Sequence, residues 1–486
     1  MVWQKVQVAP YYPDQMDLFL DPEQTRGATR ALFEQLRDGI LSGRFAAGDR
    51  ITPTRELAAQ LGISRQTVTT VYGRLAAEGF IEGRAGGGSY VAEMGGDRKR
   101  PNQPAVLSAR PPFSNEYERP AEHAVPVTYD LRPATPDPKL FPLADWRRSV
   151  VASLQTPMGG YGDPAGVLEL RRALTRWVAR SRSIATTPEQ MFVTAGAQQA
   201  IDLIVRLLVR PGDTVAIEEP GYVAARLLCE SVGAKVAPVP VDADGIVVDA
   251  IPSRARVIYT TPSHQSPTGA TLSLPRRRAL LAFAERHGIA VIEDDYDSEY
   301  RHDDRPLEPL HTLDRSGRVV YVGTFSKTLS PALRLGFAVM PASLVPAAMQ
   351  ARELMDWQAP TINQQAMVRF IGDGHLERHL RRSRKVYRER HGLVVDFVRR
   401  QAERGTLHEI ATNHAGLHVV AHLPPGGDEA DVRERARRRG VAIGNYRAAW
   451  ANPDPPPGIN IGFGTIDTGL LPQALTILEG VLDGSG

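Results

Sequence analysis

The chain has 486 residues, of which 42% are hydrophobic and 23% charged, with a formal net charge of +3 and one cysteine. This length and composition predict more than one packed domain and exclude a wholly disordered protein. The lone Cys229 excludes an intramolecular disulfide and a cysteine cluster for a metal, and we predict no metal site.

Composition divides the chain into three regions. Residues 25–92 show short helical patterns followed by a small hairpin, residues 93–128 are rich in proline and are predicted to be a linker, and residues 129–486 form a larger domain. The first ten residues have no long apolar core or cleavage pattern, so we expect no secretion signal. No run of about 18 apolar residues occurs, so we expect no membrane span and a cytoplasmic protein.

The first domain has the pattern of a helix-turn-helix with a wing. Apolar residues recur at helical spacing over residues 31–41, and a short helix over residues 54–61 stops at Gly62. Ser64 is the expected N-cap of a second helix that runs to residue 78. Two helices joined by a tight turn define a helix-turn-helix, and residues 80–82 and 89–91 would form a two-stranded wing.

This layout predicts a DNA-binding surface, although residues 1–93 carry nearly equal numbers of basic and acidic side chains. The first turn of the second helix would enter the major groove, where Arg65 and Gln66 reach base edges and neighbouring hydroxyls reach phosphates. Arg84, on the glycine-rich wing, would enter a minor groove. The residues assigned to DNA are Thr54, Arg55, Ser64, Arg65, Gln66, Thr67 and Arg84.

The module resembles the winged-helix domain of the GntR superfamily. The family's usual Pro-Ser-Ser-Arg stands here as Thr52-Pro-Thr-Arg55, and its usual Gly-Ser-Gly-Thr wing tip as Gly86-Gly-Gly-Ser89. The resemblance implies binding to double-stranded DNA. A winged helix that contacts another protein is the alternative.

From residue 129 onward, apolar strand patterns alternate with amphipathic helical patterns. Strands are predicted at residues 214–217, 257–260, 289–292 and 319–322, and helices at residues 168–179, 197–208 and 276–287. Such alternation predicts an α/β domain with a mostly parallel sheet covered on both faces. The arginine-rich stretches 378–390 and 433–439 are predicted to be solvated helix faces.

The run from Gly323 to Gly336 is the most informative segment of this domain. An apolar strand delivers Lys327 into a loop of small hydroxyl residues, and Arg334 follows seven positions later. A lysine that forms a Schiff base needs a rigid strand to place it, and hydroxyls and a guanidinium suit a phosphate. On this segment alone, an exposed loop lysine is the alternative.

Other segments carry compatible chemistry. Residues 194–199 open a helix, whose N-terminus favours a phosphate. Tyr222 follows a strand and suits stacking on a pyridine ring. Asp294 ends a buried strand 33 residues before Lys327, with Tyr296 two positions on, and a carboxylate near a pyridine nitrogen keeps that nitrogen protonated.

Together these segments resemble the fold-type-I aspartate-aminotransferase fold, which adds a smaller α+β C-terminal domain. The resemblance implies the cofactor pyridoxal 5'-phosphate (PLP), with Lys327 as its Schiff-base lysine. It also implies that Asp294 pairs with the pyridine nitrogen, Tyr296 contacts the phenolic oxygen and Tyr222 stacks on the ring. The residues implied around the phosphate are Gly196, Ala197, Gln198, Thr324, Ser326 and Arg334, with Tyr161 reaching the phosphate of a partner subunit.

Two departures from that pattern argue against efficient transamination. Ser266 stands where aminotransferases usually have an asparagine that contacts the ring oxygen. His264 or Gln265 takes its place, or both serve only the loop. The segment before residue 459 lacks the arginine that usually binds the substrate carboxylate, and Arg447 is the nearest candidate, with a surface role as the alternative.

The fusion of both modules resembles the MocR/GabR subfamily of GntR-type regulators. The resemblance implies a bacterial transcriptional regulator that senses PLP, alone or with an amine or amino acid, and forms a head-to-tail homodimer. It would control genes of PLP synthesis or of amine and amino-acid metabolism. Two other functions remain open: an active aminotransferase with an appended winged helix, and a DNA-binding repressor whose pocket has lost PLP.

Overall fold

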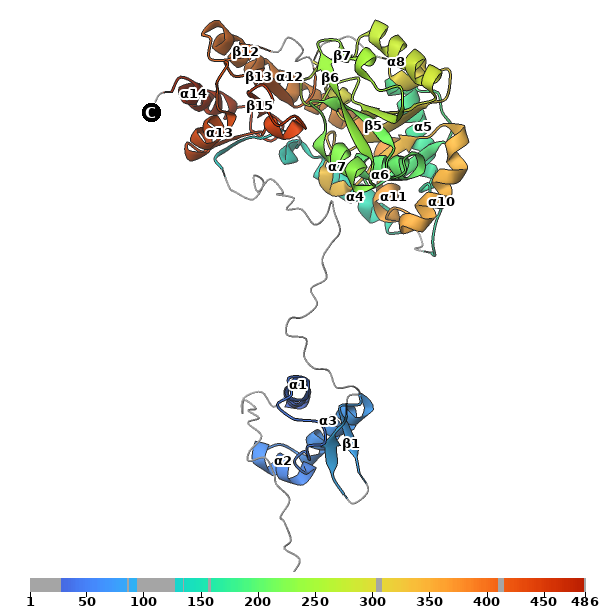
Figure 1. Cartoon of the computed structure of the whole chain (residues 1–486), viewed down its shortest axis with the longest axis vertical. Helices are drawn as coiled ribbons and strands as arrows, with labels where there is room; N and C mark the ends of the chain where they lie inside the picture. Colours follow the sequence, from blue (N-terminus) through green and yellow to red (C-terminus); the bar gives the residue numbers. More distant parts are fainter. Residues whose placement is uncertain are drawn as a thin grey trace, which may run out of the picture. The chain divides into compact units, whose positions relative to one another are not determined.

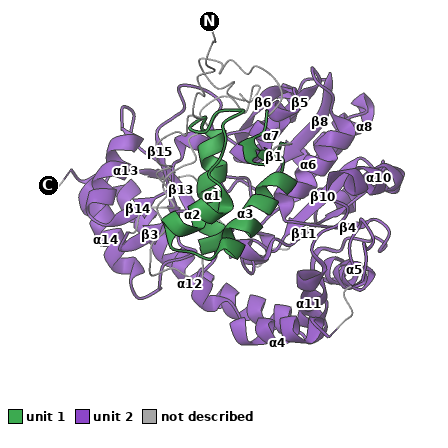
Figure 2. Cartoon of the chain, turned by 90° about the horizontal axis from the view of Figure 1, so that it is seen from below, with its two compact units in different colours: residues 1–108 green, residues 109–486 purple. Residues whose placement is uncertain are grey.

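The computed structural model describes residues 28–84, 87–93, 127–133, 135–155, 159–302, 308–409 and 415–484 (Figure 1). The chain divides into two compact units, residues 1–108 and 109–486 (Figure 2), and each is described by itself. Residues 25–27 and most of the predicted linker lie outside the described residues. Within the described ranges, no helix has the length and apolar character needed to cross a bilayer.

The smaller unit is a winged helix-turn-helix. It contains helices α1 (Ala28–Leu41), α2 (Thr54–Leu61) and α3 (Arg65–Ala77), and an antiparallel pair of strands, β1 (Ile81–Gly83) and β2 (Ser89–Val91). Gly62 ends α2 in a left-handed conformation at φ 63°, and the Ser64 hydroxyl accepts the Thr67 N–H at 3.1 Å. Leu32, Val68 and Leu75 are fully buried in its core. The predicted fold of this unit is confirmed.

The larger unit is built on an eight-stranded sheet with the order β4-β11-β10-β9-β8-β5-β6-β7. Strands β10, β9, β8, β5 and β6 pair in parallel, whereas β11 runs antiparallel to β10 and β4, and β7 antiparallel to β6. The mostly parallel sheet is thus confirmed. The strands are β4 (Met191–Thr194), β5 (Thr214–Glu219), β6 (Lys235–Asp242), β7 (Gly245–Ile246), β8 (Ala255–Thr260), β9 (Ala290–Asp295), β10 (Val319–Thr324) and β11 (Gly336–Val339).

Strand β6 is flanked unequally. Residues Lys235–Pro240 pair with β5, but β7 pairs only with Val241 and Asp242. Two of the β6 residues, Pro238 and Pro240, have no N–H to donate.

Helices cover both faces of the sheet because neighbouring strand residues point to opposite sides. In β8, Val257 packs with α6, while Ile258 packs with α8 in a separate apolar cluster. The helices of this part are α4 (Leu143–Ser153), α5 (Leu168–Arg182), α6 (Ala197–Leu208), α7 (Val223–Ser231), α8 (Leu274–His287), α9 (Leu310–Leu313), α10 (Val345–Asp356) and α11 (Thr361–Gly372).

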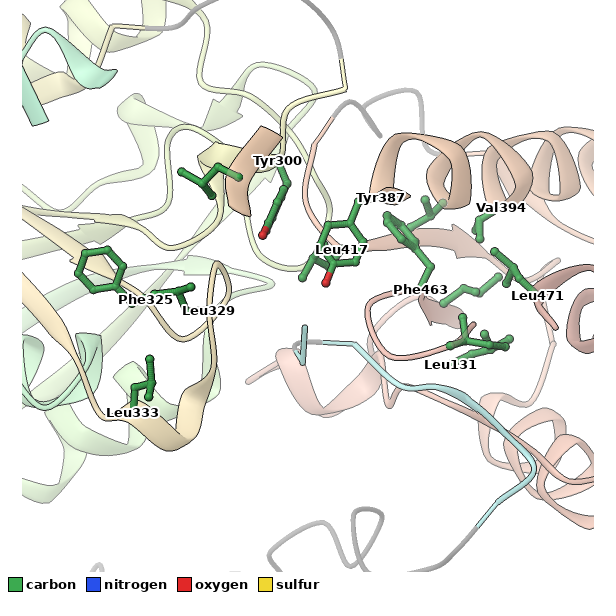
Figure 3. Packing of buried hydrophobic residues seen from close by; sticks show 14 of the residues in the cluster. Leu131, Tyr300, Phe325, Leu329, Leu333, Tyr387, Val394, Leu417, Phe463 and Leu471 are labelled. Carbon is green, nitrogen blue, oxygen red and sulfur yellow. The ribbon is translucent and has the colours of Figure 1, made fainter. Parts of the chain in front are cut away.

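A smaller α+β subdomain completes this unit. Strand β3 (Tyr129–Leu131) pairs in parallel with β14 (Val441–Ile443), and β12 (His408–Glu409), β13 (His418–His422) and β15 (Gly458–Gly462) form a three-stranded sheet. Helices α12 (His375–Glu403), α13 (Glu429–Arg438) and α14 (Leu471–Leu482) pack on these strands. One buried cluster runs from Phe325 and Tyr300 through Tyr387 to Leu131 and Leu471, and joins this subdomain to the sheet (Figure 3).

The prediction of a solvated arginine face is wrong for Arg390. Its side chain is buried on the inner face of α12, where Nη2 lies 2.7 Å from Asp137 Oδ2. Nε donates to the Thr468 hydroxyl at 2.9 Å and Nη1 to the Gly464 carbonyl at 2.9 Å. A helix of 29 residues needs an inward face, and here that face carries a cation whose three nitrogens each donate a hydrogen bond.

We predict that Asp137→Ala destabilises the larger unit by about 3–5 kcal/mol, because it leaves a buried guanidinium without its counter-ion. Urea unfolding of the full chain, followed by tryptophan fluorescence, measures this effect. The matched control is Asp396→Ala on α12, the helix of Arg390; its partner Arg399 is exposed, so this change should barely move the unfolding midpoint. Equal shifts for both variants would contradict the prediction.

Candidate functional site

A cavity of about 330 Å³ lies where the sheet of the larger unit meets the small subdomain. Its wall contains most of the predicted site residues, together with several that were not predicted. The lining residues are Pro133, Ala197, Gln198, Tyr222, Tyr259, Thr261, Ser266, Pro267, Asp294, Tyr296, Asp297, Thr324, Ser326, Lys327, Pro331, Arg334, Leu417, His418 and Asn460.

The parallel sheet explains why distant segments meet here. Strands β8, β9 and β10 are adjacent, and their carboxyl ends point to the same edge. Thr261 follows β8, Asp294 lies at the end of β9, and Lys327 follows β10. The edge beyond the carboxyl ends of parallel strands is where open α/β sheets bind ligands.

Lys327 has the electrostatic setting of a reactive amine. Burial lowers the pKa of Lys327, while the carboxylates of Asp297 and Asp294 act in the opposite direction. A lowered pKa increases the fraction of neutral amine at pH 7, and the neutral amine is the form that attacks a carbonyl carbon.

Asp294 presents one unused oxygen. Its Oδ2 accepts the Tyr259 hydroxyl at 2.7 Å, whereas its buried Oδ1 has no hydrogen-bond partner among the described residues. Burial raises the pKa of Asp294 to about 7. A buried, unpaired carboxylate oxygen in a cavity wall favours a ligand that brings a cationic N–H.

A second part of the wall forms a cradle at the N-terminus of α6. Gly196 has φ 89°, and a Cβ at this position would lie 3.1 Å from Arg334 Nη2, so the guanidinium fills the space that a side chain would need. The Arg334 guanidinium donates to the Ala195 carbonyl. Thr324 and Ser326 hydroxyls are 3.0 Å apart beside it. Hydroxyls, a guanidinium and a helix N-terminus suit a phosphate.

In the loop after β8, Ser266 and the two candidate substitutes for the missing asparagine, His264 and Gln265, have different surroundings. Ser266 lines the cavity. Gln265 serves the loop, because its amide nitrogen donates to the carbonyls of Pro220 at 2.7 Å and Ser266 at 2.8 Å. His264 is buried behind the wall, where its Nδ1 lies 3.0 Å from the Tyr296 hydroxyl.

Of the other predicted residues, Tyr222 lines the cavity but Tyr161 and Arg447 do not. Tyr161 is exposed and stacks on Trp357 with ring centroids 4.3 Å apart. The Arg447 guanidinium donates to the Pro453 carbonyl. The partner-subunit role of Tyr161 and the carboxylate role of Arg447 stay predictions.

Sequence reasoning missed His418 and Asn460, which the small subdomain contributes. Asn460 lies in the apolar strand β15, and its buried Oδ1 has no hydrogen-bond partner among the described residues. Burial lowers the pKa of His418 to about 3, so its ring is neutral at pH 7. A single polar residue within an otherwise apolar strand is the signal that would have identified Asn460.

The predicted DNA-binding residues lie on the α2–α3 segment and the wing. Arg55, Arg65 and Gln66 are exposed in the first turns of their helices. The Ser64 hydroxyl also contacts the Thr67 hydroxyl at 2.9 Å, and Thr54 begins α2. On the wing, Arg84 pairs with Glu82 at 2.9 Å and lies 5.0 Å from the Tyr90 ring centre.

Comparison with protein families separates the same two modules. The model of bacterial regulatory proteins of the gntR family matches residues 28–91, and the model of aminotransferase class I and II matches residues 114–442. These matches define a class of transcriptional regulator in which a winged helix-turn-helix is fused to an aminotransferase-like domain.

Curated relatives match almost the whole chain. The probable rhizopine catabolism regulatory protein MocR of Rhizobium meliloti is 35% identical over 471 residues, covering 95% of each chain. The HTH-type pyridoxine biosynthesis transcriptional regulator PdxR of Corynebacterium glutamicum is 30% identical over 455 residues, covering 93% of this chain and 95% of that protein. The chain belongs to the MocR/GabR subfamily of GntR-type transcriptional regulators.

Solved structures match the larger unit. An archaeal alanine:glyoxylate aminotransferase superimposes with a TM-score of 0.70 at 26% identity, covering 75% of this chain and 92% of that one. A kynurenine aminotransferase of Pyrococcus horikoshii gives 0.68 at 27% identity, covering 74% and 92%. The fold-type-I aminotransferase fold is therefore confirmed for this unit.

We predict that Asp294→Asn stabilises the ligand-free chain at pH 8 but not at pH 4. A raised carboxyl pKa favours folding below the ordinary pKa of 3.8, and this contribution is lost as the pH rises through about 7. The difference in unfolding free energy between variant and wild type should grow over that window to on the order of 4 kcal/mol. Urea unfolding at several pH values measures it, with the exposed Asp249→Asn as control. A gap that does not change with pH would contradict the prediction.

Proposed function

We propose that this regulator binds PLP in the cavity of its larger unit and uses the occupied site to control DNA binding by its winged helix. The observation that carries the proposal is that Lys327, Asp294 and Arg334 line one cavity in a chain that also has a gntR-type module. Asp294 Oδ1 has no hydrogen-bond partner among the described residues, and Gly196 lies directly against the Arg334 guanidinium. The aminotransferase folds that match this unit support the same ligand.

The residues present fit PLP group by group. Asp294 Oδ1 would accept the pyridine N–H, and Lys327 would hold the aldehyde carbon. Tyr222 would stack on the ring, and Tyr296 would donate to its phenolic oxygen. When bound, the cofactor supplies a carbonyl group that reacts with amines and a ring that withdraws electrons. The phosphate would lie among Gly196, Ala197, Gln198, Thr324, Ser326 and Arg334.

The winged helix would bind double-stranded DNA through α3 and the wing. The exposed Arg65 and Gln66 would read base edges in the major groove, and Arg84 would enter a minor groove. Thr54, Arg55, Ser64 and Thr67 would contact the backbone.

We further propose a cytoplasmic homodimer in which Tyr161 reaches the partner's phosphate site. The exposed Tyr161–Trp357 stack and Leu354, which is 82% exposed, form an apolar surface that a second subunit would cover. An amine or amino acid would act as effector, and the relatives named for rhizopine catabolism and pyridoxine biosynthesis support control of amine or PLP metabolism. The effector must favour one dimer state by a few kcal/mol to change DNA binding.

An active aminotransferase is the second candidate. The lowered pKa of Lys327 and the buried Asp294 favour it, whereas Ser266 in place of asparagine and the absence of an arginine other than Arg334 from the described cavity wall argue against it. Steady turnover of an amino acid with a keto acid by the purified chain would establish this activity.

We predict that PLP gives the purified chain an absorbance band at ~420 nm. Borohydride reduction should then attach the cofactor covalently to Lys327. Lys327→Ala should lose both the band and the covalent label, because no other amine lies in the cavity wall that the structure describes. Lys235→Ala, which removes an exposed lysine of β6, is the control and should behave as wild type. Mass spectrometry of the reduced protein identifies the labelled residue. A label that persists in Lys327→Ala would refute the assignment.

We predict that Arg65→Ala weakens binding to a DNA site selected by the wild-type chain by about ten- to a hundredfold, since a base-edge contact is worth about 1–3 kcal/mol. Fluorescence anisotropy with labelled DNA at fixed salt measures the affinity. The control is Arg30→Ala on α1, an exposed arginine paired with Glu34, which should change little. Both variants should retain the PLP band. Equal losses of DNA affinity in the two variants would mean that Arg65 does not contact base edges.

A further inference from the structure

His264 forms a buried contact network that the roles above do not use. Its Nδ1 lies 3.0 Å and 2.9 Å from the two carboxylate oxygens of Asp297, and 3.0 Å from the Tyr296 hydroxyl. His264 and Asp297 are each only 2% exposed, and both Asp297 and Tyr296 line the cavity. The loop after β8 and the end of β9 thus meet on one ring nitrogen.

Asp297 fixes the hydrogen on this nitrogen. A carboxylate only accepts hydrogen bonds. If Nδ1 of His264 carried no hydrogen, it would be a second acceptor facing the Asp297 carboxylate, whereas an Nδ1–H donates to Asp297. The Tyr296 oxygen, at 3.0 Å from the same nitrogen, then shares that donor as an acceptor. The hydroxyl hydrogen of Tyr296 is therefore not consumed by His264. On the cavity side the neighbour of this hydroxyl is Ser266.

We propose that His264, held in one tautomer by Asp297, is a positioning residue that directs the Tyr296 hydroxyl as a donor into the cavity, toward an anionic oxygen on the cofactor ring. This inference rests on the proposed binding of PLP. It gives the loop that lacks the usual asparagine a way to control the remaining donor to that oxygen.

The small subdomain encloses His264 and Asp297 with Gly416 and His418. A Cβ at Gly416 would lie 2.2 Å from His264 Cε1 and 2.6 Å from Asp297 Oδ2, and Gly416 has φ 79°, so only glycine fits there. The His418 ring lies 5.3 Å from the His264 ring, and its Nε2 is 3.0 Å from the Pro267 carbonyl oxygen. Backbone and a neutral ring therefore exclude water from the pair, which strengthens its hydrogen bonds.

The expected consequence is a change in the basicity of the lysine–cofactor linkage. A donor to the ring oxygen offsets its negative charge, and this matters most when the neighbouring nitrogen has lost its proton. The donor therefore lowers the pH at which the linkage is half protonated. The other charged side chains of the cavity wall, Asp294, Asp297 and Arg334, are present in wild type and in the His264 variants alike.

The test is a pH titration of the ~420 nm band of the PLP-loaded full chain. His264→Ala should raise the midpoint by about one pH unit, since a hydrogen bond to a charged group has that order of effect. His264→Asn, which keeps a donor near the position of Nδ1, should restore most of the wild-type value. Tyr296→Phe should raise the midpoint as well, and His264→Ala should add nothing to it in the double variant.

The outcomes distinguish a failure of the role proposed for His264 from a failure of PLP binding. Raised midpoints that are non-additive and rescued by asparagine support the role of His264. A wild-type midpoint in His264→Ala, or shifts that add to those of Tyr296→Phe, would overturn it while leaving PLP binding intact. No band in the wild type would refute both. If His264→Ala does not fold, as shown by urea unfolding without PLP, His264→Leu provides the same test, because it also removes Nδ1 but retains more of the buried volume.

Discussion

Burial of unlike charges at the carboxyl edge of the sheet is the constraint on which the cavity depends. Taking an amine or a carboxylate out of water disfavours its charged form, and the opposite shifts of Lys327 and Asp294 are the result. Neither group would hold its place in a loose scaffold, because each would move toward solvent. Strands β9 and β10 prevent this because they are adjacent and buried, with Asp294 at the end of β9 and Lys327 three residues after the end of β10.

The cavity wall is built by both parts of the larger unit, so a bound ligand can affect how the two parts are arranged. The large part of the unit supplies Lys327, Asp294 and the cradle around Arg334, but the small subdomain supplies Leu417, His418 and Asn460 to the same wall. A ligand in this cavity therefore contacts both parts at once. Any ligand that binds better when the parts are closer will shift their arrangement by its difference in affinity. A fold that elsewhere performs catalysis is thereby suited to reporting occupancy.

The sequence predicted those parts of the molecule that local rules determine. Ser64 and Gly62 mark helix ends by their own backbone preferences, and Lys327 and Asp294 are conspicuous in the sequence because they lie at or just after the ends of apolar strands. Strand order could not be read in this way, and the antiparallel β11 within the parallel sheet was not expected. Arg390 was misjudged because its environment comes from a chain segment hundreds of residues away, that of Asp137.

The two prolines of β6 have a consequence for the behaviour of the protein at high concentration. Most of this strand has no partner on its outer side among the described strands, and an open edge with free N–H and C=O groups invites pairing between molecules. Pro238 and Pro240 remove two donors from the strand, and Trp450 and Ala451 of the small subdomain lie beside them around a shallow hollow. The sheet therefore ends in a border that discourages aggregation.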